Sequence, residues 1–109
     1  METHIDAYVT QADGHRIEVR LLNGRLRAAL QALGFTADEG DTLTLPVVAD
    51  DAAKAAVFIR LRDLGIAFSA GREWCPAEVF EHLRAAGLLQ GGYLRVAWRA
   101  PQQFTVEQA

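Results

Sequence analysis

The residue best placed for chemistry is Cys75, the single cysteine of the chain. Pro76 suits the first turn of a helix, which puts Cys75 at the N-cap of that helix. A helix N-terminus favours the thiolate, which is the reactive form of cysteine. Arg72 stands three residues earlier and could add to this effect, while Trp74 would pack on the first turn as a hydrophobic staple. This stretch could therefore serve a thiol-dependent enzyme or bind a small ligand.

A nucleophilic cysteine also needs a base, and His82 stands on the same predicted helix. It is seven residues further on, about 10 Å along the helix axis at ~1.5 Å per residue, which is too far for a direct hydrogen bond. Glu78 and His82 share a helix face, but two groups do not make a metal site. We expect no catalytic residue, no metal and no cofactor, and an inert Cys75 remains the alternative to a reactive one.

The loop of residues 69–72 could hold an anion on its backbone N–H groups and on Arg72, because a helix follows it. It has neither the Gly-Lys-Ser/Thr ending of a phosphate-binding loop nor a Gly-x-Gly-x-x-Gly pattern. An ordinary connection between a strand and a helix remains the alternative.

Basic residues gather in the first third of the chain. Between residues 15 and 27, Arg16, Arg20, Arg25 and Arg27 stand against Glu18 alone, a local excess of +3. Such an excess could contact nucleic acid, although the net charge of −3 argues against nucleic acid as the partner expected by default. Solvated charge on a strand face is the alternative.

Residues 25–45, RLRAALQALGFTADEGDTLTL, resemble the swapped-hairpin DNA-binding domains of the AbrB/MazE type. In that family a short helix ends in Leu-Gly, and a Gly-Asp turn starts a strand. Here the turn is longer, the strand before the helix lacks the usual Pro, and no dimeric arm is evident. The resemblance implies a DNA-binding transcriptional regulator or an antitoxin.

Side chains that anchor protein interfaces stand on one predicted strand near the end of the chain: Tyr93, Arg95, Trp98 and Arg99. Helices must cover one face of that strand, and the other face could be open. An open face or an unpaired edge strand invites a second subunit. We therefore expect a small, non-catalytic binding protein that acts through protein–protein contacts as an adaptor, regulator or inhibitor, with another protein or with itself as a homodimer. The alternative is that Trp98 belongs to the core.

These side chains must be positioned by elements that the apolar periodicity predicts. Strands are expected at residues 4–10, 16–21, 42–47, 66–68, 93–99 and 104–107. Asp13-Gly14 predicts a hairpin turn between the first two strands. Residues 36–41 are expected to form an acidic turn, and Pro46 indicates an edge strand or a bulge.

Three helices are expected, each ended by a glycine: Gly34, Gly65 and Gly87. Each glycine follows a leucine by four residues and precedes an apolar residue, which is the pattern of a Schellman stop. Asn23 is expected to cap the first helix, and Asp50 or Asp51 the second.

The expected fold is α+β, with one mixed sheet of about five to six strands in the chain order β-β-α-β-α-β-α-β-β. Three helices lie mainly on one face, and residues 42–68 form a central parallel strand–helix–strand unit. The whole chain, residues 1–109, makes one domain.

The compartment expected is the cytoplasm, because one cysteine cannot make an internal disulfide and no export signal is seen at the start of the chain. No apolar run approaches the ~20 residues of a membrane span, so no membrane partner is expected. The preference for Arg over Lys, with much Ala and Gly, indicates a bacterial-like composition.

Overall fold

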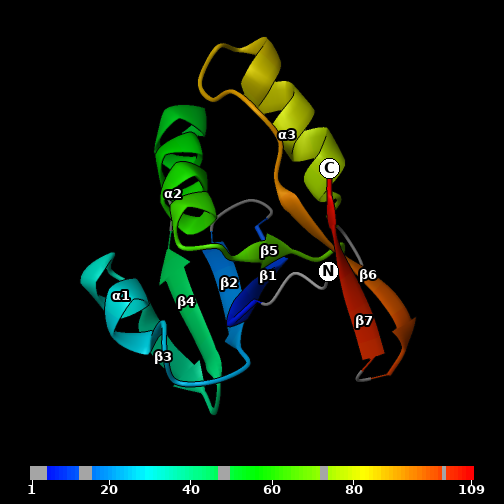
Figure 1. The fold of residues 1–109 in the computed structure, drawn as a ribbon. Coiled ribbons are helices and arrows are strands. Elements are labelled where there is room, and N and C mark those ends of the chain that lie inside the picture. Colours follow the sequence, from blue (N-terminus) through cyan, green and yellow to red (C-terminus); the bar gives the residue numbers. More distant parts are fainter. Residues whose placement is uncertain (1–4, 13–15, 47–49, 72–73, 102) are drawn as a thin grey trace.

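The computed structural model describes residues 5–12, 16–46, 50–71, 74–101 and 103–109. Seven strands form one mixed sheet, which three helices accompany (Figure 1). The strands are β1 (Ala7–Gln11), β2 (Arg16–Leu21), β3 (Thr36–Glu39), β4 (Thr42–Pro46), β5 (Ala67–Phe68), β6 (Leu94–Ala100) and β7 (Gln103–Gln108). The helices are α1 (Arg27–Ala32), α2 (Asp51–Asp63) and α3 (Pro76–Ala85). The α+β class is confirmed, with one strand more than the largest number expected.

The strands lie in the order β3-β4-β2-β1-β5-β6-β7. Strands β1, β5 and β6 are parallel to one another, and the remaining neighbours are antiparallel. Two antiparallel steps separate β4 from β1, so β4 runs in the same direction as β5. The expected parallel unit around α2 therefore exists, but β2 and β1 lie between its two strands.

The extra strand is β3, which occupies residues expected to form an acidic turn. It pairs with β4 through Thr36↔Thr44 and Ala37↔Leu43, and the turn is confined to Gly40 and Asp41. Gly40 has a positive φ of 59°, which a tight turn needs. Exposed edge strands show little apolar alternation, and for this reason the sequence pattern missed β3.

All three glycine stops are confirmed. Gly34, Gly65 and Gly87 have φ values of 105°, 75° and 74°. In each case the residue after the glycine donates its N–H to the carbonyl of the predicted leucine, at 3.0 to 3.1 Å. Helix ends are set by local chemistry, which explains why this prediction succeeded at all three positions.

The predicted helix starts agree less well with the structure than the predicted helix ends do. Asp50 caps α2 as expected, since its carboxylate accepts the N–H of Ala52 at 2.9 Å. The prediction that Asn23 caps α1 is wrong, because that helix begins at Arg27 without a side-chain cap. Asn23 instead donates to Asp6 at 2.7 Å and ties the β2–α1 loop to the residue before β1.

Strand β4 is internal and does not form the edge that Pro46 suggested. Its β3 partner reaches only to Thr44, so Pro46 stands beyond the end of that ladder and pairs with Arg16 of β2 alone. Strands β1 and β2 pair antiparallel as expected, while the Asp13-Gly14 turn between them lies outside the described residues.

Two apolar clusters lie on opposite faces of the sheet. The larger one contains Leu30 of α1, Phe58 of α2 and Phe80 of α3, packed on alternate strand residues. The smaller one is built around Tyr8, Ala67 and Val96 and, among the described residues, contains no helical side chain. Helices thus cover one face, as expected, and the opposite face is called the open face below.

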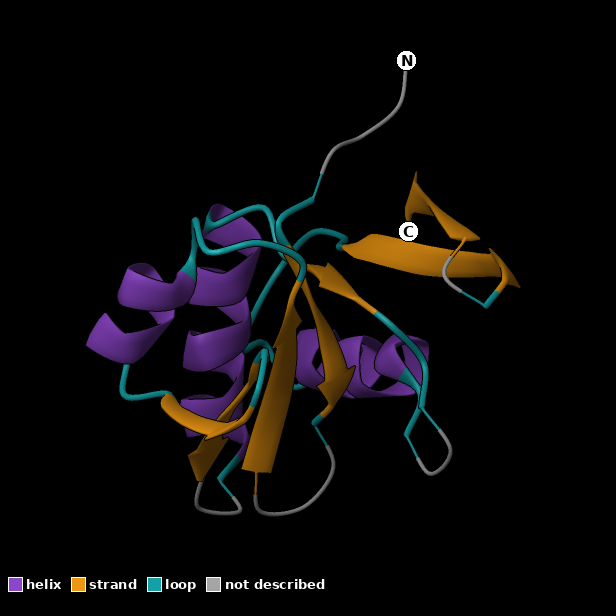
Figure 2. Cartoon of the chain, turned by 90° about the horizontal axis from the view of Figure 1, so that it is seen from below, coloured by secondary structure: helices purple, strands orange, loops and turns teal. Residues whose placement is uncertain are grey.

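The β6–β7 hairpin extends from the body of the molecule (Figure 2). Strand β5 is two residues long, and its one register pair with β6 joins Phe68 to Arg95. Beyond that pair, β6 is joined within the sheet to β7 alone. The β6–β7 hairpin and the β3–β4 hairpin therefore lie at opposite edges of the sheet (Figure 1).

Candidate functional site

Three aromatic rings form a cluster on the open face. Trp98 of β6 meets Tyr8 of β1 edge-on at 5.7 Å between ring centroids and Phe104 of β7 at 5.2 Å. Tyr8 and Phe104 lie 6.1 Å apart. Tyr8 is buried beneath the other rings, whereas Trp98 keeps 45% of its surface exposed. The alternative that Trp98 belongs to the core is therefore wrong.

Ser69 is hydrogen-bonded to Trp98 of this cluster and also to Trp74. Its hydroxyl accepts the indole N–H of Trp98 at 2.9 Å, and its backbone carbonyl accepts the indole N–H of Trp74 at 2.9 Å. Its own N–H donates to Val9 of β1 at 2.8 Å. Ser69 is 4% exposed, and its bond to Trp74 is buried while its bond to Trp98 is partly buried. They fix the exposed Trp98 ring to the buried frame of the sheet.

Two of the predicted nucleic-acid residues, Arg16 and Arg20, share the open face. Ile17 and Val19 of the same strand point into the helix-covered core, so the residues that alternate with them point the other way. Arg20 stands directly opposite Tyr8 in the β1–β2 ladder. Arg16 forms an ion pair with Glu18, at 3.6 Å. Arg20, which stands beside the aromatic cluster, has no ion pair among the described residues.

The other two predicted nucleic-acid residues lie elsewhere. Arg25 is exposed in the turn before α1, and its N–H donates to Asn23. Arg27 begins α1 and lies 3.7 Å from Asp41. The four arginines therefore do not form one continuous surface.

The predicted strand at residues 93–99 divides its candidates between two faces. Tyr93, just before β6, is buried and stacks on Phe80 at 4.2 Å, while Trp98 lies on the open face. Burial raises the pKa of the Tyr93 hydroxyl above its ordinary value. The face opposite Trp98 carries Arg95 and Arg99, which both meet Glu107.

The hydrogen bond from Arg95 lowers the pKa of the Glu107 carboxyl and, reciprocally, raises the pKa of Arg95. Both side chains are exposed, so this pair orders the hairpin surface and adds little to stability. Arg99 is the second cation on Glu107, at 3.7 Å. Arg95 and Arg99 thus brace β6 against β7.

The Cys75 region does not assemble a catalytic group within the described residues. Cys75 is exposed at the N-cap of α3 as predicted, yet its thiol has no hydrogen-bond partner there. His82 pairs with Asp51 across the α2–α3 contact, at 2.7 Å from Nε2 to Oδ2. Arg72 lies outside the described residues. The histidine therefore links two helices and does not face the thiol.

In the loop before α3, two of the amides predicted to face an anion bond to the protein itself. The N–H of Ser69 donates to Val9, and the N–H of Gly71 donates to the Trp74 carbonyl at 3.1 Å. A Cβ on Gly71 would stand 2.8 Å from the Trp74 ring and 2.9 Å from the Thr10 carbonyl. The amides of Ser69 and Gly71 are therefore engaged within the protein, and the Trp74 ring lies beside Gly71.

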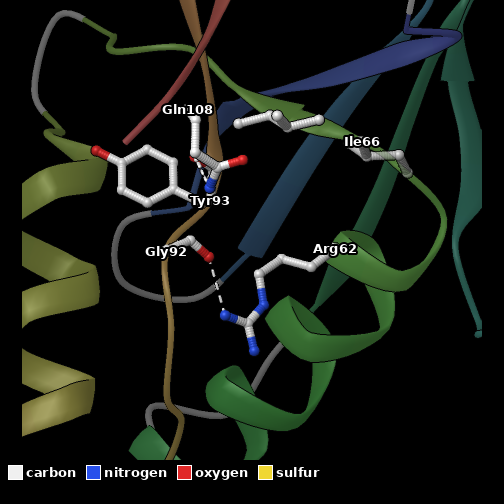
Figure 3. A pocket seen from close by; sticks show the side chains of 6 residues that line it. Arg62, Ile66, Gly92, Tyr93 and Gln108 are labelled. Carbon is white, nitrogen blue, oxygen red and sulfur yellow. Dashed lines mark hydrogen bonds between the residues drawn. The ribbon is translucent and has the colours of Figure 1, made fainter. Parts of the chain in front are cut away.

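One cavity, of about 180 Å³, opens beside Arg62 of α2 and Gly92 (Figure 3). Arg62 donates to the carbonyls of Gln90 and Gly92 at 2.6 and 2.9 Å. The other residues that line the cavity are Ile66, Tyr93, Leu94 and Gln108. A second cavity, of about 120 Å³, lies between α1 and α2. Both volumes are below the roughly 300 Å³ at which ligand pockets begin. The two hydrogen bonds of Arg62 anchor the loop that precedes β6.

Comparison with known proteins gives no relative. No protein-family model matches the chain, and no curated protein or solved structure is significantly similar to it. Within the described ranges, no group of three or more His, Cys, Asp or Glu side chains gathers as a metal site would require. Nor is any helix in those ranges long and apolar enough to cross a membrane.

Sequence reasoning missed two rings of the open-face cluster, Tyr8 and Phe104, and also Ser69, which bonds to Trp98. Tyr8 stands between Ala7 and Val9, whose side chains enter the helix-covered core. A large aromatic at the outward position of an internal strand is the signal that could have identified it. Ser69 gives no such signal, because its role depends on two tryptophans that only the fold brings to it.

Proposed function

We propose that this chain is a non-catalytic protein-binding module whose contact surface is the open face around Trp98. The observation that supports the proposal best is that a large apolar side chain is 45% exposed and yet held in place by two rings and the Ser69 hydroxyl. Exposed tryptophans that are already ordered make strong interface anchors, because binding costs little further side-chain entropy.

The expected partner is a peptide segment that carries apolar and acidic side chains. Apolar groups suit the surface formed by Trp98, Phe104 and Val106. Acidic side chains suit the positive charge of Arg20, which stands opposite Tyr8 beside this surface. The expected cytoplasmic location and the adaptor, regulatory or inhibitory role belong to the same proposal.

A random peptide display against the immobilised full chain tests the proposal. We expect enrichment of peptides that combine an aromatic or aliphatic residue with Asp or Glu. The best synthetic peptide should bind with a Kd in the micromolar range, and Trp98→Ser should weaken it by about tenfold or more.

Leu22→Ser provides the matched control, because Leu22 is 44% exposed and lies outside the aromatic cluster. This variant should bind the selected peptides as the parent does. Circular dichroism confirms that both variants are folded. Peptides that bind the parent and the Trp98→Ser variant equally well would refute the open face as the contact surface.

Single-stranded nucleic acid is a second candidate, favoured by the presence of Arg16, Arg20 and Trp98 on one face. Platforms for single strands present successive rings to successive bases, whereas here Tyr8 is buried and Trp98 is the one strongly exposed ring of the cluster. A gel shift at low salt with single-stranded and long duplex DNA decides the matter, because phosphate contacts are strongest there. Absence of any shift would remove both this candidate and the predicted DNA-binding regulator.

A further inference from the structure

We infer that a second copy of this chain joins the sheet through β7, antiparallel to the first and related to it by a two-fold axis at Thr105. The inference goes beyond the proposed function, since it rests on the edge of the sheet and not on the exposed ring of Trp98. Such a dimer would place two β6–β7 hairpins side by side in one continuous sheet.

The two edges of the sheet differ in how well they resist pairing. Strand β3 is four residues long, has a register shift between Ala37 and Glu39, and carries two consecutive acidic residues in its sequence. Short length, irregular register and charge are the features by which edge strands avoid association. Strand β7 is six residues long, pairs regularly with β6 from Phe104 to Gln108, and has one acidic residue, Glu107. Strand β7 is therefore the edge open to addition.

The β6–β7 hairpin also has few backbone contacts with the rest of the sheet. It is attached to the rest of the sheet by one register pair, Phe68↔Arg95, and extends away from the helices (Figure 2). Three or more strands with a packed apolar face are more stable than a two-stranded hairpin. A β7 strand from a second copy would give this end of the sheet a third strand.

The sequence of β7 is complementary to itself when the axis passes through Thr105. Phe104 then stands opposite Val106 of the second copy on the open face, which is a favourable aromatic–β-branched pair. Gln103 stands opposite Glu107, so the two carboxylates do not meet. At the axis, Thr105 meets Thr105, another favourable pair. An axis at Glu107 would instead put like charges together.

The molar mass in solution tests this inference. Light scattering after size exclusion should give 23.8 kDa, twice the 11.9 kDa of one chain. Thr105 is exposed and faces the side that carries Glu107, so Thr105→Lys and Thr105→Glu leave the monomer intact but place like charges at the axis. Each variant alone should elute as the monomer, and their equimolar mixture should recover the dimer.

Thr36→Lys, an equally exposed change on the opposite edge strand β3, serves as the control and should remain dimeric. A parent that stays monomeric up to about 100 µM, far above the Kd of a weak micromolar interface, would overturn the inference. A dimer that survives both Thr105 changes would overturn it equally, because another surface would then be responsible. Neither result bears on peptide binding by Trp98, which is measured separately.

Discussion

Ser69 connects the two tryptophans of the chain through different atoms. Its hydroxyl serves Trp98 on the open face, and its backbone carbonyl serves Trp74 in the loop before α3. A side-chain substitution can therefore remove one bond and leave the other in place. Ser69 thus positions the Trp98 ring through its side chain. The effect of that one hydrogen bond can be measured separately from the bond to Trp74.

Ser69→Ala should accelerate exchange of the Trp98 indole N–H with water, because that proton loses its acceptor. The Trp74 indole N–H should exchange as before, since its acceptor is the backbone of residue 69. Stability should fall by about 0.5–1.5 kcal/mol, the net value of one hydrogen bond. Proton–nitrogen NMR resolves the two indole signals, and an equal response of both would contradict this role of Ser69.

Tyr93 should make the protein sensitive to alkaline pH. Burial raises its pKa above the ordinary value of 10, so the neutral hydroxyl is favoured in the folded state. Its contribution to stability is therefore complete below pH 10 and is lost as the pH rises through the folded pKa. Urea unfolding at increasing pH should show a steeper alkaline loss for the parent than for Tyr93→Phe. Parallel curves for the two proteins would show that Tyr93 ionises freely in the fold.

At the scale of elements, helix ends and strand pairs obey different rules. The three glycine stops depend on residues four or five positions apart, so the sequence contains all that is needed to predict them. Strand β3 depends on β4, its partner, and its exposed residues carry no apolar alternation. The start of α1 was also mispredicted, because Asn23 bonds to Asp6, a residue far away in the chain.

Gly65→Ala should destabilise the protein by about 1–2 kcal/mol, the cost of a left-handed conformation for a residue with a Cβ. No atom lies within 4 Å of the added methyl group, so the loss would come from backbone strain and not from a clash. Gly24→Ala is the matched control, because the space there is equally open and its φ is not in the left-handed range. Chemical denaturation should place the control within about 0.5 kcal/mol of the parent. Equal losses at both sites would contradict the Schellman account.

At the scale of the whole molecule, Phe58 joins several elements within the helix-covered core. Its ring meets Phe68 of β5 at 5.1 Å, Phe80 of α3 at 5.2 Å and Trp74 at 6.5 Å. One side chain of α2 thus joins a strand, a second helix and the loop between them. The open-face cluster has no such position, because it is a single layer with solvent above it.

Phe58→Ala should cost about 3–5 kcal/mol, a large part of the 5–15 kcal/mol by which domains are usually stable. Trp98→Ala removes more atoms but should cost clearly less, because nearly half of that side chain already faces water. Urea denaturation of both variants measures the difference. A loss at Trp98 as large as that at Phe58 would mean that the ring supports the fold and is not free to serve as an anchor.

The sequence by itself determined the α+β class, the three helix ends, the cap of α2 and the presence of interface-type residues near β6. These features follow from short-range periodicity and capping, which act between residues close in the chain. Only the tertiary structure decided which way the stripe of Leu94, Val96 and Trp98 faces. Apolar burial has no preferred direction, so the pattern fitted contact with the helices as well as contact with Tyr8 and Phe104. The register of β6 against β5 decided that choice. Arg95 pairs with Phe68, which faces the helices, so Leu94, Val96 and Trp98 point to the face that no described helix covers.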